Sequence, residues 1–492
     1  MAHRKAAPTL TGDATAQEDG HVREPSHELI EIVDDGVTHD DVLDAKVEYF
    51  KSVGSDAAFY LGNLDKILEH HFRWMNNLPR VKPYYALKSN TTEPVVRMLN
   101  ALGTGFDCAS KREIEMALAI GVPPHKIIYA HTIKSKSHLK YAYAQGVNFL
   151  TFDNEDELKK IACVCHKARI VLRIEVDDSS AMIKLSKKFG ASMDKVPSLL
   201  ETARKLHLNV VGVSFHVGVL CEDTSAFTKA IADSRTVFDI ATAMGFHMEL
   251  VDIGGGYDGK DTNKRFEKVA EVINTALDRY FPPSSGIQII AEPGGFYAHS
   301  AFTLSVNVIG KKVERNGENS VPEIKGMTLR TMALTEPIKT LQMIVHLLYP
   351  MMCLPQLDRS VRCRDTNGEK SMAYYLNDGI HGSFSIVWNH PGYLLIEPHP
   401  HRAVEIGEPM YPSVLWGPTC DSKDKMVDDL MLPVLDIGEW LHFSNFGTYS
   451  ITPQSDFNGM DHPDIYFYIT DKTIRSLAML VKASDKLRKD AE

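Results

Sequence analysis

The 492-residue chain lacks the features typical of nucleic-acid-binding and membrane-spanning proteins. Its 54 lysine and arginine residues are outnumbered by 64 aspartate and glutamate residues, which gives a formal net charge of −10, and no long basic run is present. Because nucleic-acid binding depends on clustered positive charge, we expect no nucleic-acid partner. The longest apolar stretch outside predicted strands, Leu341–Leu354, contains His346 and Pro350. It falls short of the roughly 20 apolar residues that a membrane span needs.

Cysteine is also scarce, with seven residues in the whole chain. Cys163, Cys165 and the adjacent His166 form a close group, but no second pair completes the ligand set of a structural zinc site. An odd number of scattered thiols is typical of a reducing compartment, and the first 25 residues contain no apolar segment of a secretion signal. We therefore predict a cytoplasmic protein without a metal site and without membrane association.

The overall composition, 44% hydrophobic and 24% charged, is that of a globular protein long enough for two or three domains. Between residues 61 and 300, eight short apolar runs alternate with helix-length segments. This rhythm is typical of βα units, and the number of units predicts a (β/α)₈ barrel. The runs are Tyr84–Lys88, Gly105–Cys108, Ile127–Ala130, Phe149–Phe152, Val171–Val176, Val210–His216, Glu249–Ile253 and Gln288–Glu292.

Beyond residue 300 the pattern changes to strand-like runs joined by turns, which predicts a predominantly antiparallel β domain over 301–492. Within it we expect an insertion at about 313–370 and a final helix over Thr470–Lys489. Residues 29–60 and the strand-like Ala58–Leu61, which overlaps their end, are expected to join this domain, and residues 1–28 to be a disordered extension. The predicted strands are Ala301–Lys311, Ala373–Leu376, Phe384–Trp388, Ser413–Trp416, Trp440–Phe443 and Ile465–Ile469.

Ionisable and small residues follow the predicted barrel strands, at the end where barrel enzymes build their sites. Lys88 is either a lysine reaching to solvent or a desolvated amine of lowered pKa that forms a Schiff base. Gly254–Gly256 fits a tight turn or a phosphate cradle, and His216 fits a core histidine or a ring-stacking one. Glu292, fixed by the following proline, can hold a protonated ring nitrogen. Together these groups indicate a pyridoxal phosphate site.

The segments around these residues resemble the ornithine decarboxylase family, the group IV pyridoxal phosphate-dependent decarboxylases. The matching segments include PYYALKSN, GTGFDCASKREIE, VVGVSFHVG, VDIGGG, IIAEPG, NDGIHGSF and WGPTCDSKD. The resemblance implies an alanine racemase-like barrel and β domain, the cofactor pyridoxal 5'-phosphate and an amino-acid substrate. The positions that it assigns to the cofactor are Lys88, Asp107, Arg173, His216, Gly254, Gly255, Gly256, Glu292, Gly295 and Tyr449.

The resemblance also implies a homodimer with active sites at its interface. Cys420 matches the family's proton-donating thiol, and Asp421 matches a carboxylate that contacts the substrate. In the family the loop that carries them reaches into the barrel of the partner subunit. Lys188 and Asp424 match residues that pair across that interface.

Several positions depart from the family pattern. The phosphate-binding serine and a neighbouring glycine are replaced by Val219 and Leu220, and a phosphate-binding arginine is replaced by Gly295. Valine and glycine have no side-chain donor for a phosphate, so we expect weakened cofactor binding, by about 1–3 kcal/mol for each lost contact.

The substrate pocket departs from the pattern as well. The aspartate that grips the distal ammonium of ornithine is replaced by Asn389, preceded by Trp388 in place of a tyrosine, and another site tyrosine is replaced by His381. A buried ammonium without a charge partner is costly, so specificity should shift toward a neutral aliphatic amino acid such as leucine.

Two functions of different classes remain open. One is an amino-acid decarboxylase that releases an amine and CO₂. The other is a catalytically inactive homologue similar to the antizyme inhibitors, in which Lys134–Lys160, with Lys136 and Lys140, would correspond to the antizyme-binding surface. The retained Lys88 and Cys420 favour the enzyme, whereas Val219 and Gly295 favour the inactive homologue.

Overall fold

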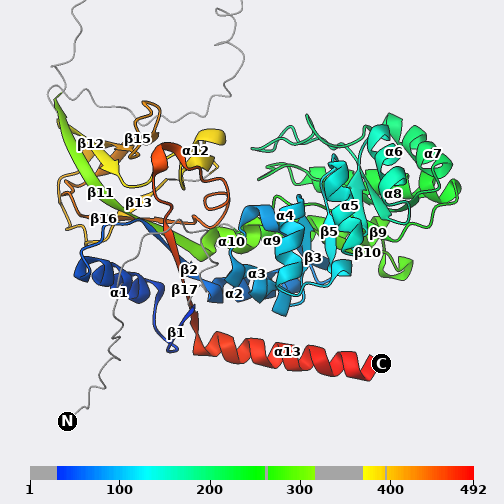
Figure 1. The fold of residues 1–492 in the computed structure, drawn as a ribbon, viewed down its shortest axis with the longest axis horizontal. Helices are drawn as coiled ribbons and strands as arrows, with labels where there is room; N and C mark the ends of the chain where they lie inside the picture. The colour runs from blue at the N-terminus through cyan, green and yellow to red at the C-terminus, as the bar shows by residue number, and fades with distance from the viewer. Residues whose placement is uncertain (1–29, 261–263, 316–369, 394–395, 492) are drawn as a thin grey trace, which may run out of the picture.

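The computed structural model describes residues 30–260, 264–315, 370–393 and 396–491. The predicted disordered extension over 1–28 lies outside the described residues, as does almost all of the predicted insertion over 313–370. Within the described part, a barrel and a β-sheet domain lie side by side (Figure 1), which confirms the predicted fold class.

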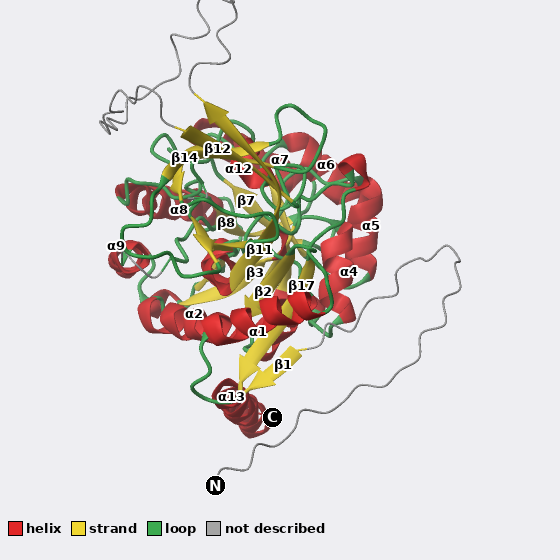
Figure 2. Ribbon diagram, turned by 90° about the vertical axis from the view of Figure 1, so that its left-hand side faces the viewer, coloured by secondary structure: helices red, strands yellow, loops and turns green. Residues whose placement is uncertain are grey.

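Eight parallel strands close the barrel, with β10 pairing to β3. Helices surround the strands (Figure 2). The barrel strands are β3 (Val81–Ala86), β4 (Gly105–Cys108), β5 (Ile127–Tyr129), β6 (Phe149–Phe152), β7 (Arg169–Arg173), β8 (Asn209–Ser214), β9 (Leu250–Asp252) and β10 (Gln288–Ala291). The helices are α2 (Leu64–Asn77), α3 (Glu93–Ala101), α4 (Lys111–Ala119), α5 (Lys136–Ala144), α6 (Glu155–Val164), α7 (Val196–Lys205), α8 (Ser225–Ala243) and α9 (Arg265–Tyr280).

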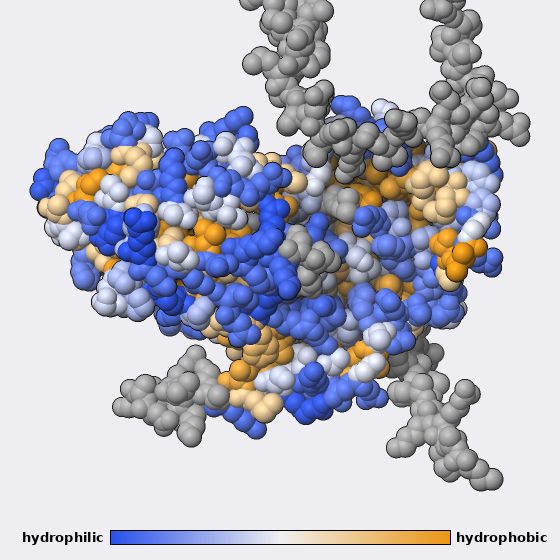
Figure 3. Space-filling view, turned by 180° about the vertical axis from the view of Figure 1, so that it is seen from behind, coloured by the Kyte–Doolittle hydropathy of each residue, from blue (hydrophilic) through white to orange (hydrophobic). Residues whose placement is uncertain are grey.

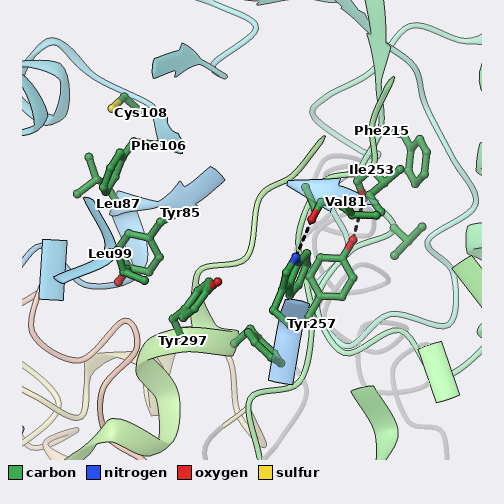
Figure 4. Close-up of a cluster of buried hydrophobic side chains, with 14 of the residues drawn as sticks. Val81, Tyr85, Leu87, Leu99, Phe106, Cys108, Phe215, Ile253, Tyr257 and Tyr297 are labelled. Carbon is green, nitrogen blue, oxygen red and sulfur yellow. Dashed lines mark hydrogen bonds between the residues drawn. The ribbon is translucent and has the colours of Figure 1, made fainter. Parts of the chain in front are cut away.

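Local sequence explains where these helices begin and which face they bury. The Ser110 side chain accepts a hydrogen bond from the Glu113 amide at the start of α4, and Asn154 caps α6 in the same way. Around the barrel, aromatic side chains such as Tyr85 and Tyr257 pack into one continuous core (Figure 4). This packing fixes the strand ends that carry the functional residues.

The second domain is a mixed nine-stranded sheet in the order β1-β17-β2-β11-β12-β14-β15, with β16 paired to β11 and β13 paired to β16. Strands β1 and β2 come from the segment before the barrel, and α1 (His39–Ser52) packs its apolar face on the sheet. The strands are β1 (Ile30–Val33), β2 (Phe59–Asn63), β11 (Phe302–Arg315), β12 (Lys370–Leu376), β13 (Pro398–Pro400), β14 (Tyr411–Trp416), β15 (Lys425–Leu432), β16 (Trp440–Ser444) and β17 (Asp464–Thr470).

One predicted strand is wrong. Phe384–Trp388 is the start of a short helix, α12 (Ser385–Asn389), and not a strand. The preceding turn determines this, because the Asp378 carboxylate accepts hydrogen bonds from the amides of Gly379 and Ser383 and so curls the chain. The buried Phe384 and Ile386 therefore come from one helical turn.

The chain ends in α13 (Asp471–Ala491), which extends below the barrel in Figure 1. No helix among the described residues is long and apolar enough to cross a membrane. The face of the molecule seen in Figure 3 is largely hydrophilic, with apolar side chains scattered over it.

Candidate active site

The carboxyl ends of the barrel strands open into a cavity of about 560 Å³ that is closed on its far side by α12 and by residues 449–453 of the sheet domain. Because parallel strands end on one side of the barrel, residues far apart in sequence meet there. The lining residues are Lys88, Ala109, Ala130, His131, Arg173, Ile183, Leu185, Phe189, His216, Val219, Glu292, Ile386, Asn389, His390, Tyr449 and Pro453.

Lys88 lies in the turn after β3, and 40% of its side chain remains accessible, so its amine can be reached from the cavity. Its Nζ donates a hydrogen bond of 2.7 Å to Oδ2 of Asp107, a carboxylate on β4 that is 1% exposed. Burial acts to lower the pKa of Lys88, but the charge of Asp107, with a smaller contribution from Glu292, outweighs it and raises that pKa. The lowered pKa expected from the sequence is therefore wrong, because the expectation omitted the carboxylate on the neighbouring strand.

Glu292 follows β10 and lines the cavity. Burial, reinforced by the charges of Asp107 and Asp252, raises the pKa of Glu292 well above its ordinary value. Burial also raises the pKa of Asp252 to about 6, although its carboxylate accepts a hydrogen bond from the Gly254 amide. A cation placed beside Glu292 would favour the charged carboxylate, so the site suits the protonated ring nitrogen of a pyridine.

His216 contributes a neutral ring to the cavity wall. Its Nδ1 accepts a hydrogen bond of 3.1 Å from the Gly218 amide, which leaves the ring proton on Nε2. Burial first, and then the charges of Arg173 and Lys88, lowers the pKa of His216 well below its ordinary value. An uncharged imidazole fixed in this way can stack on a flat ligand.

The glycine triplet after β9 requires glycine at each position. Gly254 and Gly256 have φ of +66° and +90°, a region that favours glycine. A Cβ on Gly254 would lie 2.2 Å from the Phe215 carbonyl oxygen, and a Cβ on Gly256 would lie 2.1 Å from the Gly218 carbonyl oxygen. A Cβ on Gly255 would lie 2.5 Å from the Glu292 carbonyl oxygen. The packing of a tight turn therefore accounts for these glycines, and the phosphate cradle stays a prediction.

The two departures after His216 have distinct structural effects. Val219 lines the cavity, and its backbone pairs with Ile183 through hydrogen bonds of 3.1 and 3.4 Å. Leu220 holds a left-handed φ of +51°, a conformation that glycine adopts at lower cost. The chain therefore keeps the backbone of a glycine turn there without the glycine.

Cys420 and Asp421 do not line the cavity. Cys420 is exposed, and its amide and Sγ both lie within 3.1 Å of Asn458 Oδ1. Asp421 Oδ2 lies 2.9 Å from His381 Nε2, and the His381 ring stacks on Phe457 with centroids 4.3 Å apart. These five residues form a second group, which we call the thiol cluster.

Other predicted residues also lie outside the cavity lining, namely Asp107, the glycine triplet, Gly295, Trp388, Asp424 and Lys188. Trp388 is 53% exposed and lies under Lys423, since residues next to each other in α12 point in different directions. Asp424 is 1% exposed, and its carboxylate accepts hydrogen bonds from the Ile380 amide and from Thr419. Lys188 lies over the Phe189 ring, with Nζ 5.1 Å from the ring centroid.

His131 is one of the ionisable residues at strand ends that the sequence pattern singles out; it follows β5, accepts a hydrogen bond from the Ile133 amide and lines the cavity. The sequence prediction missed other lining residues. His390 and Ile386 reach the cavity only because α12 is a helix that lies against the barrel. Nothing in their local sequence indicates this.

A barrel of this kind, joined to a β-sheet domain and centred on a lysine among buried carboxylates, defines a class of pyridoxal phosphate-dependent decarboxylases. The family model "Pyridoxal-dependent decarboxylase, pyridoxal binding domain" matches residues 64–299, and "Pyridoxal-dependent decarboxylase, C-terminal sheet domain" matches residues 357–447. Together with its relatives, these matches show that the chain belongs to the ornithine decarboxylase family of this class.

The relatives include both enzymes and antizyme inhibitors. The chain is 42% identical to ornithine decarboxylase of Rattus norvegicus over 92% of this chain and 88% of the relative. It is 40% identical to antizyme inhibitor 2 of Xenopus laevis over 94% and 91%. Among solved structures, the arginine decarboxylase of Paramecium bursaria Chlorella virus matches with a TM-score of 0.71 and 31% identity, over 87% of this chain and 99% of that chain.

Proposed function

We propose that the protein is a pyridoxal phosphate-dependent decarboxylase of a neutral aliphatic amino acid such as leucine, acting in the cytoplasm. The observation that carries the proposal is the cavity itself, in which Lys88 is accessible and Glu292 is the one carboxylate among the described lining residues. Ornithine and arginine, named in the relatives, both end in a cationic group, and a second cation would find no free carboxylate in this lining.

The cofactor fits the residues present. The glycine turn would form a cradle, one buried oxygen of Asp107 lacks a hydrogen-bond partner, and the buried acid Glu292 lines the cavity. Lys88 would hold pyridoxal phosphate through its amine, His216 would face its ring, and Glu292 would hold its ring nitrogen. When bound, the cofactor supplies an electron sink for the electron pair left by the departing CO₂.

The chain's own groups control the protons. Asp107 accepts the hydrogen bond of the Lys88 ammonium, so it is placed to keep a proton that the amine must release before it acts as a nucleophile. Apolar lining residues such as Ile183 and Val219 exclude water from the carboxylate that leaves. Cys420 would return a proton to the substrate carbon, the role that the family resemblance gives it.

The thiol cluster lies outside the cavity of its own chain, which supports a homodimer in which each chain completes the site of the other. The Asp421 carboxylate that would arrive this way is already paired with His381 at 2.9 Å.

The test combines cofactor trapping with a substrate panel. We expect borohydride reduction of the full chain with pyridoxal phosphate to leave a pyridoxyl group on Lys88, detected by mass spectrometry and absent in Lys88→Ala. Amine release should be faster from leucine than from ornithine, and Asn389→Asp should raise the ornithine-to-leucine ratio by about tenfold or more. Absence of an adduct would refute the cofactor, and equal rates from both amino acids would refute the specificity.

A second candidate function is that of an antizyme inhibitor. Val219 and Gly295 favour it, because both remove expected phosphate contacts, and antizyme inhibitors are among the relatives. The surface expected over Lys134–Lys160 needs correction, since the Lys134 side chain is fully buried and paired with Glu157 at 2.9 Å. Antizyme binding without any pyridoxyl adduct would establish this function instead.

A further inference from the structure

Gly295 stands where the family resemblance places a phosphate-binding arginine. It is the first residue of α10 (Gly295–Ala298). A Cβ built on Gly295 would lie 3.4 Å from the Tyr393 hydroxyl oxygen, 3.4 Å from Thr448 Cγ2 and 3.7 Å from Thr448 Oγ1. The path that a longer side chain would take from position 295 is therefore occupied by two hydroxyl-bearing residues.

One of the two hydroxyls lacks a partner within the described part of the chain. Thr448 is fully buried, and its Oγ1 has no hydrogen-bond partner there. Tyr393 is 6% exposed, and its hydroxyl oxygen lies on the same side of Gly295. Buried hydroxyls are normally paired, so an unpaired one with a second hydroxyl close by indicates a ligand that accepts hydrogen bonds.

The two residues lie beside the elements expected to hold the cofactor phosphate. Thr448 directly precedes Tyr449, which lines the cavity, and the Tyr393 and Tyr449 rings are 6.2 Å apart between centroids. Gly259, in the loop that continues from the glycine triplet, packs on the Gly295 carbonyl oxygen, since a Cβ there would lie 2.7 Å from it. The hydroxyls, the glycine loop and Tyr449 therefore meet around Gly295.

We propose that Tyr393 and Thr448 donate hydrogen bonds to the phosphate of pyridoxal phosphate and replace the arginine that Gly295 cannot supply. The inference rests on the proposed function, because it requires that the chain bind this cofactor. Burial, together with Tyr449 and Asp258, raises the pKa of Tyr393, so its hydroxyl keeps its proton at neutral pH and can donate. The two neutral hydroxyl groups then bind the phosphate in place of the arginine cation that the family resemblance implies.

The test compares pyridoxal phosphate with pyridoxal, which lacks the phosphate. Equilibrium binding to the full chain is followed by absorbance, and Tyr393→Phe and Thr448→Val remove one hydroxyl each with little change in shape. We expect each variant to bind pyridoxal phosphate about tenfold more weakly, with unchanged affinity for pyridoxal. The matched control is Tyr297→Phe on α10, whose hydroxyl lies 3.1 Å from His71 Nδ1 and which should bind both ligands as the wild type does.

Each result bears on a different claim. If the wild type binds pyridoxal phosphate and both variants keep its preference over pyridoxal, or lose affinity for both ligands equally, the inference is overturned and the proposed function stands. If the wild type binds neither ligand, the proposed function fails and the inference fails with it. Circular dichroism spectra that match the wild type ensure that a loss in the variants is not caused by unfolding.

Discussion

At the scale of single residues, the contact between Lys88 and Asp107 controls the chemistry of the site. The 2.7 Å hydrogen bond joins the only cavity-lining lysine among the described residues to a buried carboxylate. Burial of an amine alone would lower its pKa and make it a nucleophile near neutral pH, whereas the carboxylate reverses the direction of the shift. Under the proposed function, Lys88 is therefore kept charged until its proton is transferred.

This balance predicts the effect of Asp107→Asn. Without the carboxylate, only the smaller effects of Glu292 and Tyr449 oppose burial, so the pKa of Lys88 should fall and more free amine is present at a given pH. We expect an amine-reactive reagent to label Lys88 about tenfold or more faster at pH 8 in the variant, measured by mass spectrometry. The exposed Lys205 serves as an internal control, and an unchanged labelling rate at Lys88 relative to Lys205 would contradict the prediction.

The sequence patterns predicted which segments of the chain reach the cavity better than they predicted which side chains within those segments border it. Lys88, His216 and Glu292 each end a strand-like run, and the parallel barrel brings such ends together. Trp388 and Asn389 are neighbours in sequence, yet only Asn389 borders the cavity, because a helix separates adjacent side chains by about 100°. The direction of a side chain depends on the element that carries it, and here the predicted element was wrong.

At the scale of elements, a histidine network links β11, β13 and β16 beside α1. His442 Nδ1 lies 2.9 Å from Ser305 Oγ, and its Nε2 lies 3.1 Å from Nδ1 of His401, just after β13. Burial first, and then His401, His39 and His399, lowers the pKa of His442 to about 3. Protonation of His442 is therefore unfavourable while the sheet is intact.

The network predicts a pH dependence of stability. The unfolded chain takes up a proton at His442 near pH 6.5, whereas the folded chain does so only near pH 3, so stability falls as the pH drops through this window. Between pH 8 and pH 5 we expect His442 to account for a loss of about 2 kcal/mol in the free energy of unfolding.

Urea unfolding of the wild type and His442→Gln at both pH values measures this contribution. The variant is expected to lose about 2 kcal/mol less than the wild type between pH 8 and pH 5, since its side chain does not titrate. The exposed His247→Gln is the matched control and should behave as the wild type does. Equal losses in the wild type and His442→Gln would show that the histidine network does not govern the acid side of the stability curve.

At the scale of the whole molecule, the regular repetition of βα units made the barrel predictable from the sequence. The parts of the fold that lack such a repeat were predicted less completely. Eight βα units have a local period that sequence displays directly. The sheet domain draws β1 and β2 from one end of the described chain and β17 from the other, a long-range pairing that no local pattern encodes. The same holds for the cavity wall formed by α12 and for the hydroxyls around Gly295.

The separation of the cavity from the thiol cluster leads to a prediction about assembly. If each chain lends its thiol cluster to the cavity of its partner, Lys88→Ala and Cys420→Ala should each lose most activity as homodimers. Coexpression of the two variants should restore about a quarter of the wild-type activity, because half of the dimers are mixed and each mixed dimer holds one intact site of two.

Analytical ultracentrifugation of the coexpressed variants is the control, because a failure to recover activity has a clear meaning only if the variants form dimers. Mixed dimers without activity would show that Cys420 acts within its own chain. The 420–424 loop, which carries the exposed Cys420, would then have to move toward its own barrel. Such a movement would have to separate Asp424 from Ile380 and Thr419, whose amides hold that buried carboxylate at 2.9 and 3.0 Å. Since breaking a buried, charge-assisted network of this kind is costly, a fixed loop that serves a second copy is the arrangement we expect.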